Sequence, residues 1–463
     1  MQKFLANYAT AAHLAILAVA PLFLSPFCAQ ETVATCLLWL SLLVATWVVM
    51  SPACRSGEPP HMARERLLAD AVRDPAMWFM LVVVAYAGVR ALNGGVALAY
   101  DAELGAWSFK RQAVEILPGC TDGAGCLPFA TTVALAVLLL GARHALDASS
   151  AVAFFATATV LAGLSAAISA IALTYGGGTI AGIAACSYES PSFIGAAYGI
   201  HLLGGIVAMF GCVEQGWHRV EPLVAIGLVC TAAGLTLFSP IATFAVFAAV
   251  FIVFALVSFA VSSRRLAGSG SFRCALVLVM VAAVPVLMAM FASSFGPLAQ
   301  RAADALELKF FPEGFLKSRD VLSSIALKSW TANPWFGSGL GSFHLDVRFI
   351  ATQDDWLHIA PWQAAAMNGW WQLLAERGVA GALLLALGAA FLAWTFFARA
   401  VRSFRSAKWS SLCFIGLFSA AALAALAFVD CSFLRPDVLL AAAAALSLAA
   451  CAFRRTSSRN TGN

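Results

Sequence analysis

Long apolar runs, separated by short polar or charged stretches, dominate the chain. A helix that crosses the hydrocarbon core of a bilayer needs about 20 mostly apolar residues, and runs of this kind recur along the whole sequence. The pattern predicts an all-α polytopic membrane protein with about twelve transmembrane helices. The runs lie near residues 11–29, 33–51, 76–97, 127–142, 150–174, 195–213, 221–238, 240–262, 273–293, 371–398, 410–429 and 433–453.

Basic residues gather in alternate polar segments, as the cytoplasmic loops of membrane proteins do. With the N-terminus inside, every short segment assigned to the cytoplasm carries at least one Lys or Arg, and segments 52–75 and 399–409 carry four each. We therefore expect a multi-pass protein of the bacterial inner membrane with both termini in the cytoplasm. Residues 1–293 should hold the first nine spans, 294–370 a large periplasmic loop, and 371–463 the last three spans and a short tail.

Composition agrees with this arrangement and narrows the functions. Hydrophobic residues make up 62% of the chain and charged residues 11%, against about 25% charged residues in soluble domains. The net charge of +5 is too small to indicate nucleic-acid binding, and the bilayer is the expected partner. The spans contain almost no ionisable side chains, which argues against a proton relay or ion pathway inside the membrane.

Cys120 and Cys126 differ in setting from most of the other cysteines, which lie within apolar runs. Both lie in a polar, Gly-rich stretch of the outer segment near residues 98–126. Because the compartment outside the inner membrane is oxidising, a disulfide between them is expected, with two unpaired thiols as the alternative.

The large loop at 294–370 begins its most patterned part at Arg319. From 319 to 331 apolar residues recur at helical spacing, which predicts an amphipathic helix lying at the membrane surface and ending before Asn333-Pro334. Gly337, Gly339 and Gly341 follow. Glycines at this density permit a tight backbone path and can bring N–H groups close to a ligand.

These residues closely resemble the signature of the O-antigen ligase and O-antigen polymerase family of polytopic membrane proteins. The family pattern is an Arg, one or two helical turns, and then Asn-Pro, an aromatic residue or Leu, and Phe-Gly-x-Gly-x-Gly-x-Phe, which matches Arg319 through Phe343. A second family segment, His-Asn-x-x-Leu-x-x-Leu-x-Glu-x-Gly-x-x-Gly, matches Asn368 through Gly381. The resemblance is specific over 319–381 and looser over Ser187–Gly211.

The resemblance implies a GT-C-like membrane glycosyltransferase that works on the periplasmic face without a metal or nucleotide cofactor. Its donor would be an undecaprenyl-diphosphate-linked glycan, and its acceptor a hydroxyl of a second glycan or of lipid A-core. The reaction would serve the biosynthesis of O-antigen or exopolysaccharide, and a flippase and a chain-length regulator are the implied protein partners. Between polymerase and ligase, the sequence leans slightly to polymerase.

The resemblance also implies roles for individual residues. Arg319 matches the family's loop arginine and would hold the diphosphate, whose oxygens a guanidinium binds in pairs. A general base is also needed, and His suits neutral pH. His344 and His358 are the candidates for it in the loop. Further candidates for substrate binding, each with a surface or interfacial role as the alternative, are Arg90, Arg301, Lys317, Arg348, Asn368 and Glu376.

Two family positions differ in this chain. Met367 occupies the place of the usual base, and Pro240 follows Ser239 where the family has an arginine. His344 or His358 would then supply the base, and Arg90 would replace the arginine. The competing hypothesis is a degenerate, non-catalytic member of the family, acting as a bicarbonate-like solute transporter or as a subunit of a polysaccharide export complex.

Overall fold

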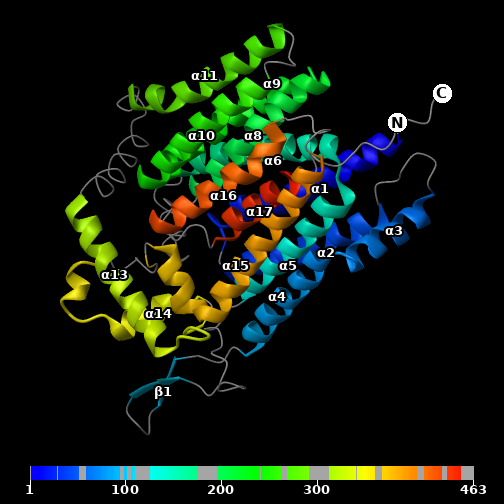
Figure 1. Ribbon diagram of the computed structural model, residues 1–463. Coiled ribbons are helices and arrows are strands. Elements are labelled where there is room, and N and C mark those ends of the chain that lie inside the picture. Colours follow the sequence, from blue (N-terminus) through cyan, green and yellow to red (C-terminus); the bar gives the residue numbers. More distant parts are fainter. Residues whose placement is uncertain are drawn as a thin grey trace.

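In the computed structural model, the described parts of the chain form a bundle of long apolar helices. A small loop unit, residues 312–339 and 341–359, lies at one end of the bundle (Figure 1). The structure describes residues 2–28, 30–51, 59–93, 98–101, 106–109, 126–175, 195–239, 241–262, 268–290, 312–339, 341–359, 366, 368–403, 411–429 and 435–449.

Each apolar run in the sequence falls on one of the long helices. Within the described ranges, ten helices are long and apolar enough to cross a membrane, and Tyr8–Leu24 and Pro436–Ala449 are shorter apolar helices. The chain is therefore a polytopic, mainly helical membrane protein. The apolar helices of the bundle are α1 (Gln2–Leu24), α2 (Gln30–Met50), α4 (Pro75–Leu92), α5 (Cys126–Leu140), α6 (Ala148–Tyr175), α8 (Gly195–Gln215), α9 (Glu221–Phe238), α10 (Ile241–Ser262), α11 (Gly268–Met290), α15 (Gly369–Ser403), α16 (Ser411–Val429) and α17 (Pro436–Ala449).

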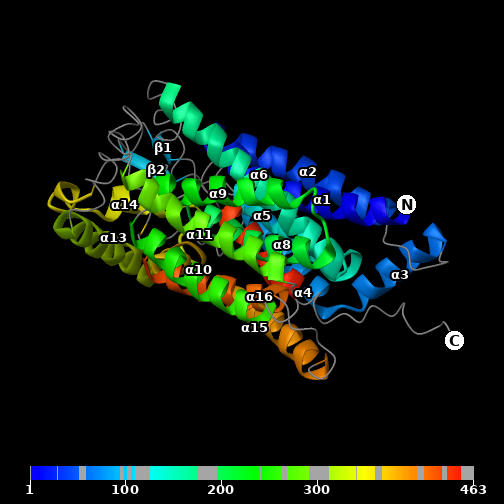
Figure 2. The ribbon, with the colours of Figure 1, turned by 90° about the horizontal axis from the view of Figure 1, so that it is seen from above.

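Several smaller elements lie at the two ends of the bundle. Strands β1 (Leu98–Asp101) and β2 (Ala106–Phe109) pair as an antiparallel hairpin, an addition to the all-α expectation. The hairpin, α13 (Pro312–Ala332) and α14 (Phe343–Ile350) lie at one end, and α3 (Pro60–Val72) and the start of α1 lie at the other, in both views (Figures 1 and 2). The loop segments expected outside therefore share one end of the molecule.

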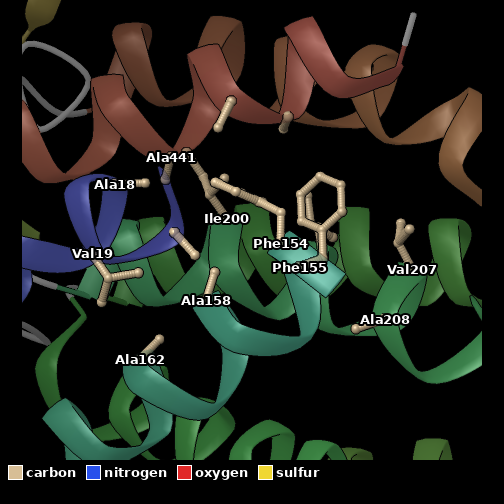
Figure 3. Packing of buried hydrophobic residues seen from close by; sticks show 14 of the residues in the cluster. Ala18, Val19, Phe154, Phe155, Ala158, Ala162, Ile200, Val207, Ala208 and Ala441 are labelled. Atoms are coloured by element: carbon tan, nitrogen blue, oxygen red, sulfur yellow. The ribbon is translucent and has the colours of Figure 1, made fainter. Parts of the chain in front are cut away.

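Helix α8 lies at the centre of the bundle, and every residue from Gly195 to Cys212 is buried. Buried residues of α1, α6 and α17 pack together with those of α8. Phe154 and Phe155 of α6 and Ile200 of α8 are among them (Figure 3). Small residues let these helices approach closely, as is common in membranes. A side-chain carbon on Gly163 of α6 would lie 2.8 Å from the Cα of Gly227 of α9.

The loop unit has a hydrophobic core of its own. Leu322 and Ile325 of α13 pack with Phe343 and Val347 of α14 and with Ala375 of α15. Part of the apolar face of α13 is therefore buried against protein, and the position of this helix at the membrane surface stays a prediction. The helix also begins at Pro312, earlier than Arg319.

Candidate functional site

The candidate site is built on a break in α15. Gly378 has φ 62° and ψ −169°, so the helix stops near residue 377 and restarts after it. A helix end leaves backbone carbonyls without partners and a helix start leaves N–H groups without partners. At membrane depth such groups must be satisfied by other parts of the protein.

The Gly-rich turn after α13 fills this break. Ser338 N donates to Ala375 O (2.8 Å) and Gly339 N to Glu376 O (3.2 Å), which satisfies the end of the first half-helix. The bonds at the start of the second half-helix run the other way, from Val379 N to Pro334 O (2.9 Å) and from Ala380 N to Trp335 O (3.0 Å).

The glycines of the turn therefore allow its backbone to pack against the backbone of α15. Gly337 has φ 69°, and Gly341 has φ 71°. The N–H groups of Gly337, Ser338 and Gly339 donate to carbonyls of the chain, and that of Gly341 donates to the Glu376 carboxylate. The structural role predicted for these glycines fits this arrangement. The sequence-based suggestion that their N–H groups face a ligand does not, because those groups already donate within the protein.

Arg90, at the end of α4, bonds to both parts of the junction between the Gly-rich turn and the break in α15. Its side chain is fully buried, at 0% exposure. Nη1 donates to Phe336 O (2.9 Å) and to Tyr86 Oη (3.0 Å), and Nη2 donates to Glu376 O (3.4 Å). The structure thus places Arg90 at carbonyl oxygens of both the turn and the broken helix, inside the protein.

A group of hydroxyls surrounds one carboxylate beside the turn. Asp346 Oδ2 accepts hydrogen bonds from Ser338 Oγ (2.6 Å) and Ser329 Oγ (2.8 Å), and Ser342 Oγ lies 2.6 Å from Ser338 Oγ. Burial raises the pKa of the Asp346 carboxyl, although the bonds from Ser338 and Ser329 oppose this. These bonds fasten α13, the turn and α14 to one another.

Arg319 lies in a different part of the loop unit, at the end of α16. Its Nη2 donates to Phe428 O (2.5 Å), and the Phe428 ring lies 6.2 Å from the ring of Trp370. Asn368 Oδ1 accepts from Trp370 N (3.1 Å) and thereby caps the start of α15. The structure therefore brings together the two segments that carry the family resemblance. Arg319 is ten residues from Ser329 on α13, a rise of about 15 Å, so it is well separated from the Asp346 cluster.

The remaining candidates are dispersed. Lys317, Arg348 and His358 are exposed, whereas Glu376 is buried and bonds to Gln372. His344 lies in the first turn of α14, and the structure does not describe its side chain. The predictions for Arg301, Met367, Pro240 and Cys120 fall outside the described residues.

Cys126 begins α5, and its thiol is exposed and unbonded within the described part of the chain. Its pairing with Cys120 stays a prediction. Among the described residues, no group of His, Cys, Asp or Glu is arranged to hold a metal ion.

Sequence reasoning missed a buried ionic cluster at the opposite end of the bundle. Asp74 accepts hydrogen bonds from Arg143 Nε (2.6 Å) and Nη2 (2.9 Å), and His144 Nε2 lies 3.0 Å from the same carboxylate. Asp74 also caps α4 by accepting from Ala76 N (3.0 Å). Burial opposes ionisation, yet the bonds from His144 and Arg143 hold the pKa of Asp74 well below its usual range. The Asp-Pro step before an apolar run was the available signal.

A second buried pair opens α17, where Arg435 Nε lies 3.1 Å from Asp437 Oδ1. Both side chains are almost fully buried. The spacing Arg-Pro-Asp at the start of an apolar run was its signal in the sequence.

No protein-family model matches the chain, and no curated protein shows a significant match to it. Its function is inferred from its residues and their geometry.

Proposed function

We propose that this chain is a glycan polymerase or ligase of the O-antigen type, with twelve spans and both termini in the cytoplasm. The observation that carries the proposal is that Arg319 and the Asn368–Trp370 segment both approach Phe428 at the end of α16, Arg319 at its carbonyl and Trp370 at its ring. These two segments are far apart in sequence and hold the residues of the family resemblance. Their approach to the same residue is what a shared substrate site requires.

In this site Arg319 binds the diphosphate of the lipid-linked donor. Arg319 is partly exposed, so it remains accessible to a ligand. Arginine binds phosphate oxygens in pairs and keeps its charge, which stabilises a diphosphate leaving group. Trp370 and Phe428 are exposed beside it and are suited to contact the apolar part of a lipid donor at the membrane interface.

The reaction is a displacement at the anomeric carbon of the donor. An acceptor hydroxyl oxygen bonds to that carbon while the bond from carbon to the diphosphate oxygen breaks. The electron pair leaves with the undecaprenyl diphosphate, and the hydroxyl proton passes to a base. His358 is exposed and can meet an acceptor, and His344 is the second candidate for this base.

The second candidate function is a non-catalytic one, in solute transport or in a polysaccharide export complex. Met367 at the family's base position favours it, because a thioether cannot take a proton. The burial of Arg90 favours it as well, since this arginine is not open to a diphosphate.

The test is complementation of a strain that lacks the gene, with surface polysaccharide followed on gels. Arg319→Ala, His344→Ala and His358→Ala are compared with wild type at matched membrane levels. Lys328→Ala is the control, because Lys328 is an exposed cation on the same helix as Arg319. Loss of long-chain or lipid-linked glycan with Arg319→Ala and one His variant supports an enzyme. Wild-type glycan from every variant favours the non-catalytic function.

A further inference from the structure

We propose that Arg90 is a positioning residue, which holds the outer loop in the break of α15 and does not touch the substrate. Only its effect on glycan transfer rests on the proposed function. Its hold on the loop follows from the geometry of the junction alone.

The guanidinium sits where three elements meet. It lies at the end of α4 and reaches the carbonyl of Phe336 in the Gly-rich turn and the carbonyl of Glu376 in α15. Its carbon Cζ lies 5.7 Å from the centre of the Tyr86 ring, whose hydroxyl also accepts from Nη1. A planar guanidinium can serve several acceptors at once, which a lysine ammonium on a single flexible stem does less well.

The surroundings also compensate the buried charge. A buried cation is costly unless it is paired or well hydrogen-bonded. Residues 369–377 form the first half-helix of α15, and the carbonyls at its end carry the negative end of the helix dipole. The Glu376 carbonyl is one of these, so Arg90 lies at a helix C-terminus that favours a positive charge.

The position of other residues in the loop unit also depends on this junction. The turn that Arg90 holds connects α13 to α14, and it carries Ser338, whose hydroxyl bonds to Asp346. Helix α13 in turn carries Arg319. Release of the turn from α4 therefore changes the position of Arg319 without removing any group from the proposed diphosphate site.

The experiment measures how readily the loop opens. Purified protein in lipid nanodiscs is treated with trypsin, and cleavage after Lys328 is timed. Lys328 lies within α13, so cleavage there requires local unfolding of the loop unit. Arg90→Met should speed this cleavage at least about tenfold, because several hydrogen bonds to a charged group are lost. Arg90→Lys should remain clearly faster than wild type, and Val89→Ala, an exposed neighbour on α4, should match wild type.

A double variant sharpens the test. Gly378→Ala disrupts the same junction from the other side, so Arg90→Met combined with Gly378→Ala should be cleaved little faster than the faster single variant. If the two substitutions instead multiplied the cleavage rate independently, Arg90 and Gly378 would not act on a shared junction. If Arg90→Met does not assemble, Tyr86→Phe replaces it, with a smaller increase expected.

Binding of undecaprenyl diphosphate to the same samples separates a positioning role from direct contact. Fast cleavage in Arg90→Lys supports positioning, and a loss of affinity that accompanies it is the expected result of displacing Arg319. Weakened binding with wild-type cleavage would make Arg90 a ligand and overturn the inference, and so would wild-type values of both. These readouts need no glycan transfer, so the inference survives even if the proposed enzyme activity is absent.

Discussion

Gly337 and Gly378 allow the Gly-rich turn and the broken helix α15 to pack backbone against backbone. A side-chain carbon on Gly337 would lie 2.5 Å from Arg377 N, and one on Gly378 would lie 2.5 Å from Phe336 N. Both residues also have positive φ, at 69° and 62°. Only glycine meets both demands at once.

Replacing either glycine with alanine should therefore loosen the loop unit. A left-handed conformation costs a non-glycine residue about 1–3 kcal/mol, and the close backbone contact adds to that. Gly216→Ala is the matched control, because Gly216 has φ 70° but nothing within 4 Å of the added carbon. Thermal unfolding followed by tryptophan fluorescence should show a larger loss for Gly337→Ala and Gly378→Ala than for Gly216→Ala. Equal losses of thermal stability would mean that the close backbone contact adds nothing to the cost of the positive φ.

The position of most helices could be predicted because hydropathy is a local property. The Ser239-Pro240 step, for example, predicted a boundary, and α9 ends at Phe238 while α10 begins at Ile241. The break at Gly378 could not be predicted in this way, since it falls inside the apolar run at 371–398. Which glycine in a span takes a positive φ depends on a turn some forty residues earlier in the chain, which periodicity does not report.

The candidate site could be predicted only in part, because local patterns select residues but do not report their partners. The resemblance selected Arg319 and the Asn368 segment, and in the structure Arg319 and Trp370 both approach Phe428. Helical spacing predicted an apolar face on α13 but not the residues of α14 and α15 that pack against it. Arg90 was expected at the substrate, and hydropathy gives no sign that its acceptors are carbonyls from 246 and 286 residues further along the chain.

Removing the charge of Asp74 should destabilise the opposite end of the bundle. Asp74→Asn leaves the buried guanidinium of Arg143 without a counter-charge, at an expected cost of about 3–5 kcal/mol. The double variant Asp74→Asn with Arg143→Met should recover part of this loss, because no uncompensated charge remains. Thermal unfolding and membrane yield measure both, and a double variant that is the less stable of the two would contradict the pairing.

The ionisation of Asp346 should make the loop unit less stable as pH rises. Burial raises the pKa of this carboxyl, so the folded loop holds the proton more tightly than the unfolded chain. Its contribution is complete below the pKa of an unfolded aspartate, about 3.9, and is lost as pH rises through the raised folded value. Asp346→Asn cannot ionise, and its melting temperature should fall less over this range than that of wild type. Parallel curves for the two proteins would remove Asp346 as the cause.

Orientation in the membrane is open to a direct test with reporter fusions. Chains cut and fused after Val72 in α3 or after Phe109 in β2 place the reporter at opposite ends of the bundle (Figure 2). The positive-inside rule predicts a cytoplasmic reporter after Val72 and an outer one after Phe109. Fluorescent protein should therefore mature only in the first fusion, and alkaline phosphatase should be active only in the second. The reverse pattern would place the loop unit in the cytoplasm.

Release of undecaprenyl diphosphate by the purified protein tests the proposed glycosyl transfer most directly. The sample is the full chain in lipid nanodiscs, supplied with an undecaprenyl-diphosphate-linked oligosaccharide and a glycan acceptor but no metal or nucleotide. Wild type should release the lipid diphosphate and lengthen or transfer the glycan, Arg319→Ala should lose most of this rate, and Lys328→Ala should keep it. Wild-type protein that binds the donor but releases no lipid diphosphate, with a range of acceptors, would contradict an enzymatic function.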